Sequence, residues 1–315
     1  MKFKLSLIAL LACVVLSLGC QNMNKKSKKK LTKENSILVQ DKFGEVRVPK
    51  SPKRVVIFHF GALDMFEALG LSDEVVGFPK QIVPDYLNEL EVNDSIRSTG
   101  SIVEPNFKIV NELHPDLIIM GARQSDARKE FQKIAPTIFF NLDYNHYIES
   151  ISKNLKRFGK IYSLTDKAAA LNDTMLQNIE NKRKEFSKLN KKGLIVLFNN
   201  GKFSAYGPGS RFGFIHSLFG IPPVSKDIAV AKHGNSISSE YIMEQNPDVL
   251  FVIDRTAAIG EGHIHKSAVE NELVQQTVAY KNGHIIYLTP DLWYLASGGV
   301  QSMNMMTDEM EQVLE

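Results

Sequence analysis

Cysteine is nearly absent from this chain of 315 residues, because Cys13 and Cys20 are the only two and both lie near the N-terminus. The sequence after Cys20 can form no internal disulfide bond, so the folded body must be stabilised by a packed core alone. Hydrophobic residues make up 43% of the chain, which is enough for one large or two medium-sized domains.

The sequence also lacks the motifs of several enzyme classes. No Gly-x-Ser-x-Gly occurs, which excludes the nucleophile elbow of an α/β-hydrolase. The zinc-hydrolase pattern His-Glu-x-x-His is missing, and His263 and His265 lie instead in a polar segment that contains glycine. The dinucleotide-binding and P-loop patterns are missing as well. We therefore expect no catalytic residues and no permanently bound cofactor.

Only one long apolar run is present, from Leu5 to Leu18, and it follows Lys2 and Lys4. A helix needs roughly 20 apolar residues to span a bilayer, so this shorter run is typical of a secretory signal peptide. The small residue Gly19 ends it. The sequence predicts a signal peptide over residues 1–19 and an exported protein.

Cys20 follows directly, and the segment from Leu16 to Cys20 resembles a bacterial lipobox, although Ser17 stands where leucine is usual. The resemblance implies that a lipid on Cys20 anchors the protein to the extracytoplasmic face of a cell membrane. The alternative is an ordinary signal peptide followed by a free cysteine. Residues 20–38 are polar and rich in lysine, which predicts a flexible tether. The lysines of this tether either bind anionic lipid next to the anchor or only keep the segment soluble.

Charge is divided unevenly along the chain. The formal net charge is +3, and residues 1–30 contribute seven lysines and no acidic residue, so residues 31–315 carry −4. A slightly acidic body argues against nucleic acid as a partner, because a nucleic-acid-binding face is basic. If the body binds an anion, its positive charge must be concentrated locally.

Short apolar runs alternate with amphipathic segments through the body, which predicts an α/β fold with mostly parallel strands. A helix of about six turns is expected from Asp166 to Leu189, where Pro and Gly are absent and charge is high. The expected strands are Val55–Phe58, Val75–Phe78, Leu117–Met120, Thr137–Asn141, Gly193–Phe198, Val249–Ile253 and His284–Leu288. The expected shorter helices are Leu63–Leu69, Phe107–Leu113 and Ala127–Ile134, with a last helix from about Gln301.

The two halves of the body repeat one pattern, in which a helix end is followed by Pro-Asp and a buried strand. Pro115 and Pro247 mark the two copies, and Arg123 and Arg255 each follow eight residues later. Both arginines therefore lie just past the carboxyl end of a strand, where open α/β sheets bind ligands. A single arginine there is usually a surface residue, but two at matching positions predict convergence on one anion.

A third arginine, Arg211, follows the turn Gly207-Pro208-Gly209 and precedes an apparent helix. Backbone N–H groups at a helix start and a guanidinium are both suited to an anion.

These features together resemble the class III solute-binding lipoproteins of ABC importers, and in particular those for catecholate siderophores of the petrobactin and enterobactin-fragment type. The resemblance implies two Rossmann-like α/β lobes, residues 39–164 and 192–315, joined by a single long helix over residues 165–191. The stretches that carry it are Phe60–Asp64, Pro115–Ile119, Arg123–Ser125, Ile134–Thr137, Ser210–Gly213, His233–Gly234 and Trp293–Gly298.

The resemblance also implies the site. Arg123, Arg211 and Arg255 match the family's basic residues, which would neutralise a ferric tris-catecholate of charge near −3. His233 and Tyr294 match residues that complete the Fe(III) shell when the siderophore offers only four donors, and both are acceptable ligands for a hard ferric ion. The alternatives are that His233 is an ordinary loop residue and that Tyr294 only donates a hydrogen bond.

Family members also present one glutamate from each lobe to arginines of the permease. Glu240 matches in the C-terminal lobe, whereas Lys108 stands at the corresponding N-terminal position, so Glu104 is the substitute we expect. The expected function is delivery of a ferric catecholate-type siderophore, as a monomer, to an ABC permease. The alternatives are a binding protein for haem, cobalamin or another metal chelate, and, less favoured, a hydrolase that processes siderophores.

Overall fold

A computed structural model describes residues 31–231 and 233–314, and those from Lys33 onward belong to one compact unit. The signal peptide and the lipidation site at Cys20 therefore lie outside the described residues. No helix in the described part combines the length and the apolar character that a membrane crossing requires.

The N-terminal sheet has five strands in the order β5-β4-β3-β6-β7, all parallel. Its central strand, β3, is completely buried, as the run of β-branched residues predicts. The strands are β3 (Val55–Ile57), β4 (Val75–Phe78), β5 (Arg97–Ser98), β6 (Leu117–Met120) and β7 (Thr137–Phe139). The helices of this half are α1 (Phe60–Leu69), α2 (Asn88–Glu91), α3 (Phe107–Glu112), α4 (Arg128–Ile134) and α5 (Tyr147–Tyr162).

An antiparallel hairpin, β1 (Ser36–Asp41) and β2 (Gly44–Pro49), precedes this sheet. The Asp41 carboxylate fixes it, because it accepts hydrogen bonds from the backbone N–H of Phe43 at 2.7 Å and of Phe139 at 2.8 Å. Since β1 begins at Ser36, the hairpin includes the last three residues of the predicted tether.

The C-terminal sheet has the order β10-β9-β8-β11-β12, in which β8, β11 and β12 are parallel and β9 runs antiparallel to both of its neighbours, β8 and β10. β8 turns into β9 at Asn200-Gly201, both at positive φ, which is the turn that suits a two-residue hairpin. The strands are β8 (Gly193–Asn199), β9 (Lys202–Tyr206), β10 (Asn235–Ile237), β11 (Val249–Asp254) and β12 (Ile285–Leu288). The helices are α7 (Phe214–Phe219), α8 (Ser239–Gln245), α9 (Arg255–Ala258), α10 (Lys266–Val269), α11 (Val278–Lys281), α12 (Pro290–Leu295) and α13 (Val300–Glu309).

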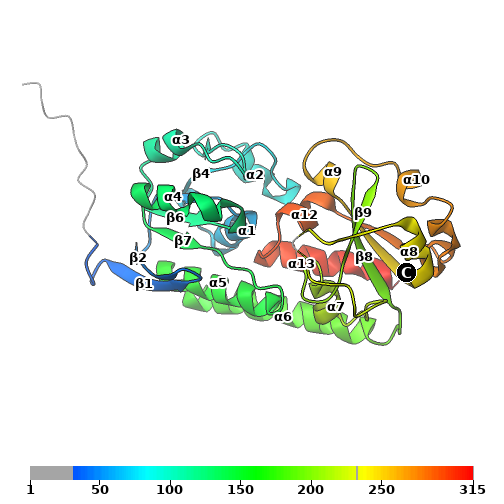
Figure 1. The fold of residues 1–315 in the computed structure, drawn as a ribbon. Helices are drawn as coiled ribbons and strands as arrows, with labels where there is room; N and C mark the ends of the chain where they lie inside the picture. Colours follow the sequence, from blue (N-terminus) through cyan, green and yellow to red (C-terminus); the bar gives the residue numbers. More distant parts are fainter. Residues whose placement is uncertain (1–30, 232, 315) are drawn as a thin grey trace, which may run out of the picture. The chain divides into compact units, whose positions relative to one another are not determined.

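The long helix α6 (Thr165–Phe186) lies between the two halves in sequence and packs against helices of both (Figure 1). Its buried residues are Ala168, Met175, Ile179 and Phe186, and it contacts α5 and α1 of the N-terminal half and α7 and α13 of the C-terminal half. The predicted helix over Asp166–Leu189 is confirmed, although it ends at Phe186.

Helix α13 follows the C-terminal sheet in sequence but packs against α1 of the N-terminal half. The buried carboxylate of Asp64 in α1 accepts hydrogen bonds from three successive N–H groups at the start of α13 and one from the Tyr86 hydroxyl. A side chain at Gly299 would collide with this carboxylate, at 2.2 Å, so only glycine permits the approach. The two halves are thus joined by this buried contact as well as by α6.

Candidate ligand-binding site

Arg123 and Arg255 lie just past the carboxyl ends of corresponding strands. Arg123 is in the 3₁₀ segment Ala122–Ala127 that follows β6, and Arg255 is the first residue of α9, directly after β11. Asp254 caps α9 by accepting the N–H of Ala257 at 3.1 Å, which ends the strand at that point. The repeat in the sequence therefore corresponds to equivalent places in the two sheets.

Tyr294, in α12, joins the three arginines. The guanidinium carbons of Arg123, Arg211 and Arg255 lie 5.9, 4.3 and 5.9 Å from the centroid of its ring. Its hydroxyl accepts a hydrogen bond from Nε of Arg255 at 3.2 Å, and its backbone carbonyl accepts one from Nη2 of Arg211. Residues far apart in the sequence thus form one cationic cluster around a single phenol.

The loop before α7 positions Arg211 by close backbone packing. Gly209 has a φ of 75°, and Ser210 donates to the carbonyl of Gly207 at 2.5 Å, which closes a tight turn. A Cβ on Gly213 would lie 2.3 Å from that same carbonyl. Larger residues cannot follow this path, so the glycines that suggested close backbone approach are needed for it.

The three guanidiniums have only neutral partners in the described part of the chain. Arg255 donates to the amide oxygen of Asn199 at 3.0 Å in addition to Tyr294, and none of the salt bridges among residues 31–231 and 233–314 includes Arg123, Arg211 or Arg255. Three positive charges without a carboxylate partner are unfavourable unless a ligand neutralises them. The cluster is therefore suited to a multiply charged anion.

The pKa values in the cluster reflect this crowding. Burial lowers the pKa of Arg123, and the positive charge of Arg211 lowers it further. For Tyr294, burial opposes ionisation, but the charges of Arg211 and Arg255 and their hydrogen bonds outweigh it and lower the pKa of the phenol. A phenolate is thus easier to form here than in water, which suits a hard metal ion.

His59, which the sequence analysis missed, faces the same cluster from the end of β3. Its Nδ1 accepts the backbone N–H of Gly61 at 3.2 Å and caps α1, while its ring packs on Phe140 with centroids 4.4 Å apart. Burial, followed by the charges of Arg123 and Arg211, lowers its pKa to about 3. The rule that found Arg123, that ligand sites lie past the carboxyl ends of strands, also applied to this residue.

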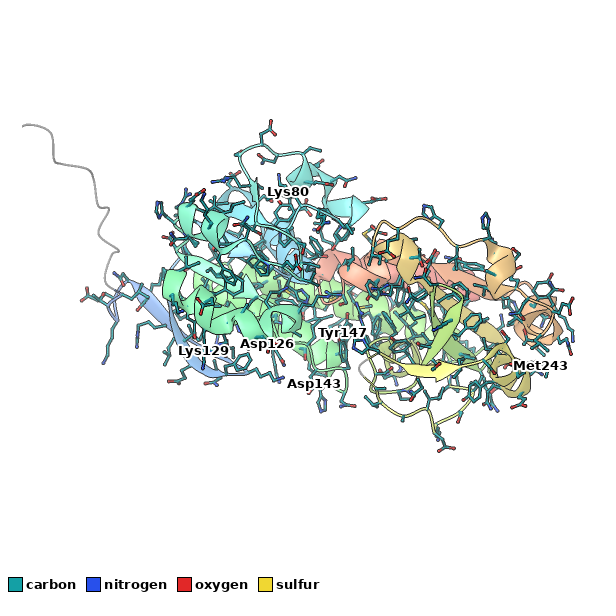
Figure 2. All side chains as sticks on the ribbon, turned by 45° about the horizontal axis from the view of Figure 1, so that its top comes forward. Lys80, Asp126, Lys129, Asp143, Tyr147 and Met243 are labelled. Atoms are coloured by element: carbon teal, nitrogen blue, oxygen red, sulfur yellow. The ribbon has the colours of Figure 1, made fainter. Side chains whose placement is uncertain are left out.

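A stack of aromatic rings lies beside the cluster and connects the two halves. Tyr147, labelled in Figure 2, stacks on Phe214 with centroids 4.3 Å apart, and Phe214 stacks on Trp293 at 5.6 Å. Trp293 is 1% exposed and donates from Nε1 to Glu309 at 2.6 Å. Trp293 is therefore a core residue, next in sequence to Tyr294.

His233 makes no hydrogen bond or ring contact with the cluster within the described part of the chain, and its role as a ligand stays a prediction. It lies exposed in a turn before β10, next to Gly234, whose Cα packs on the ring of Tyr206.

The two candidate docking residues are both exposed. Glu240 is in the first turn of α8, where Ser238 caps the helix, and hydrogen bonds from the Glu240 backbone and from Ser238 lower the pKa of its carboxyl. Glu104 lies in the loop before α3, beside an open hollow lined by Gly100, Ser101 and Asn106. Both carboxylates are available to a partner.

Comparison with known proteins agrees with this geometry. The profile of the family described as periplasmic binding protein matches residues 55–292. The chain belongs to this family. It is 47% identical to the petrobactin-binding protein YclQ of Bacillus subtilis, over 100% of this chain and 99% of YclQ, and 32% identical to the ferric-anguibactin-binding protein FatB of Vibrio anguillarum, over 98% of each.

Solved structures give the same picture. The crystal structure of YclQ superimposes with a TM-score of 0.87, at 46% identity, covering 89% of this chain and 99% of that one. The siderophore-binding protein BauB, solved with two molecules of acinetobactin and ferric iron, superimposes with a TM-score of 0.82 at 31% identity, covering 89% and 99%. The predicted family, its two-lobed α/β fold and its role as a binding protein instead of an enzyme are confirmed.

Proposed function

We propose that this protein binds a ferric catecholate-type siderophore and delivers it to an ABC permease. The observation that carries the proposal is the group of three guanidiniums around Tyr294, which have only neutral partners among the described residues. The names of YclQ, FatB and BauB, which refer to petrobactin, anguibactin and acinetobactin, support a ferric chelate as the ligand.

Electrostatics favours a trianionic ligand. A ferric tris-catecholate has a charge near −3, and each guanidinium at about 4 Å contributes roughly 4 kcal/mol at an effective dielectric constant of 20, before desolvation is deducted. Arginine remains charged even where burial lowers its pKa, and its planar donors match pairs of catecholate oxygens. Haem and cobalamin offer fewer negative charges to such a group.

Tyr294 and His233 have a proposed role with tetradentate siderophores, which leave two positions of ferric iron open. The lowered pKa of Tyr294 favours a phenolate ligand. His233 would add an imidazole ligand from the exposed turn before β10, where the neighbouring Gly234 packs close to the ring of Tyr206. With hexadentate siderophores neither residue would bind the metal.

The ligand is tested by titrating the protein with ferric petrobactin, a simple ferric tris-catecholate, haem and cobalamin. The ferric catecholates should quench the fluorescence of Trp293, which adjoins Tyr294, while haem should give no Soret shift. Replacing Arg211 by Gln should weaken binding of the ferric complexes by tenfold or more. Unchanged fluorescence together with no iron retained by the wild type would refute the proposed ligand.

The anchor and the docking surface are further parts of the proposal. We propose that a lipid on Cys20 retains the monomeric protein at the extracytoplasmic face of the membrane, and that Glu240 and Glu104 contact arginines of the permease. Iron uptake by cells that produce the E240R variant should fall while binding of the ferric complex in solution stays unchanged. Intact uptake by E104R would remove Glu104 from the docking surface.

A further inference from the structure

His59 occupies the carboxyl edge of the N-terminal sheet together with Arg123. It lies two residues after the end of β3, and Gly121 directly follows β6, the strand that pairs with β3. The ring of His59 lies against Gly121, because a Cβ added there would be 2.5 Å from Cδ2 of the histidine. The histidine is therefore placed at the same edge from which Arg123 enters the cluster.

The hydrogen bond at Nδ1 determines the tautomer of His59. The backbone N–H of Gly61 donates to Nδ1, so this nitrogen must present a lone pair, and in the neutral ring the proton is then on Nε2. The contact also serves as the cap of α1, which keeps the ring in one orientation. Packing against Phe140 fixes the ring plane further.

Nε2 is left without a protein partner. No hydrogen bond among the described residues uses it, and it is not among their buried atoms that lack a partner, so it reaches solvent. The charges of Arg123 and Arg211 act on the ring in addition to its burial, which agrees with its place at this edge. A donor held in one orientation thus lies against Gly121, two residues before Arg123, at the strand edge where that arginine enters the cluster.

We propose that His59 is a ligand-contacting residue of this site, whose Nε2–H donates a hydrogen bond to an oxygen of the bound anionic chelate while the ring stays neutral. The inference rests on the proposed function. A neutral donor suits this position because a fourth cation would add to the repulsion among Arg123, Arg211 and Arg255, whereas an N–H group adds specificity for oxygen without adding charge.

The test uses His59→Asn, because the asparagine side-chain oxygen can still cap α1 while the Nε2–H group is lost. His114→Asn is the matched control: His114 is exposed at the opposite edge of the sheet, before β6, and its φ of 45° is one that asparagine tolerates. Both variants and the wild type are titrated with ferric petrobactin and with a ferric tris-catecholate, and their thermal unfolding is recorded.

We expect His59→Asn to bind about 10- to 100-fold more weakly, the range for loss of a hydrogen bond to a charged group, with His114→Asn within twofold of the wild type. A twofold or smaller change in a folded His59→Asn variant overturns the role of His59 and leaves the proposed function intact. Failure of the wild type to bind either complex overturns the proposed function, and the role of His59 with it.

A second measurement does not depend on the variant being folded. In wild-type protein with ¹⁵N-labelled histidine, the His59 ring, identified by its proximity to the Gly61 amide, should be neutral with the proton on Nε2 at pH 7. Addition of the diamagnetic gallium(III) complex of petrobactin should shift the Nε2–H signal and leave Nδ1 nearly unchanged. A charged ring, or an Nε2–H signal that does not move at saturation, contradicts the inference.

Discussion

Replacing Asp64 by Asn should destabilise the protein strongly although it changes only one atom of the side chain. One carboxylate oxygen accepts from the N–H groups of Val300 at 2.7 Å and Gln301 at 2.9 Å, and the other from Ser302 N–H at 2.7 Å and the Tyr86 hydroxyl at 2.9 Å. An amide can serve only one of these pairs, because its NH₂ group would point at donors on the other side.

The magnitude follows from these contacts. Two hydrogen bonds to a charged group are lost, at about 1.5 kcal/mol each, and the negative charge at the start of α13 contributes up to about 2 kcal/mol in buried geometry. The variant should therefore lose about 3–5 kcal/mol in the free energy of unfolding, which corresponds to a fall in Tm of roughly 6–10 °C at about 2 °C per kcal/mol for a protein of this size.

Chemical and thermal unfolding, followed by circular dichroism, measure this loss. Asp73→Asn is the control, because Asp73 is exposed in the segment after α1 and should change stability by less than about 0.5 kcal/mol. Burial raises the pKa of the Asp64 carboxyl, and the N–H groups of Ser302 and Gln301 offset this rise only in part. If the free-energy cost of burying the charge exceeded the gain from its hydrogen bonds, the Asp64→Asn variant would be as stable as the wild type. That result would refute our account of this contact.

Three further predictions concern the site. Tyr294→Phe and His233→Ala should weaken binding of tetradentate ferric siderophores more than that of hexadentate ones, and equal losses in a fluorescence titration would remove both residues from the iron shell. Because positive charge lowers the pKa of Tyr294, Arg255→Gln should raise it, and ultraviolet absorption of the tyrosinate during a pH titration should show the shift. The pKa of His59 is about 3 when folded and near 6.5 when unfolded, so the unfolded state binds the extra proton and stability falls from pH 6.5 toward pH 3. His59→Asn should lose less stability over that interval, and parallel curves from denaturant titrations would contradict this.

The sequence predicted the sheets well where strands are fully buried. Val75–Phe78 and Leu117–Met120 are confirmed to the residue, because continuous apolar runs bounded by polar residues mark parallel strands. The hairpin of β8 and β9 was missed although Asn200-Gly201 is a strong turn signal. Helix α5 was also missed, although its buried residues Ile151, Leu155, Phe158 and Tyr162 recur at helical spacing.

The sequence predicted those residues of the candidate site that belong to a pattern repeated in both halves of the chain or to a family motif. Arg123 and Arg255 were found because each follows Pro-Asp and a strand, and Tyr294 because of the family resemblance. His59 and Asp64 have no such pattern. His59 is influenced by Arg211, and Asp64 accepts a hydrogen bond from Val300, both of which are distant in sequence. Only the folded chain therefore reveals that His59 is a neutral donor and that Asp64 caps a helix.

The contact between α1 and α13 explains how the cationic cluster persists without counter-ions. Arg123 and Arg211 belong to different halves of the protein, and burial together with the positive charge of Arg211 lowers the pKa of Arg123. Repulsion of this kind would separate two halves connected only by α6. The hydrogen bonds of Asp64 and the stack of Tyr147 on Phe214 oppose it, so the arginines stay in position before the ligand arrives. Binding of a trianion then removes the repulsion among the arginines. Because the fold already holds these arginines in position, this gain adds to the affinity without requiring the two halves to close.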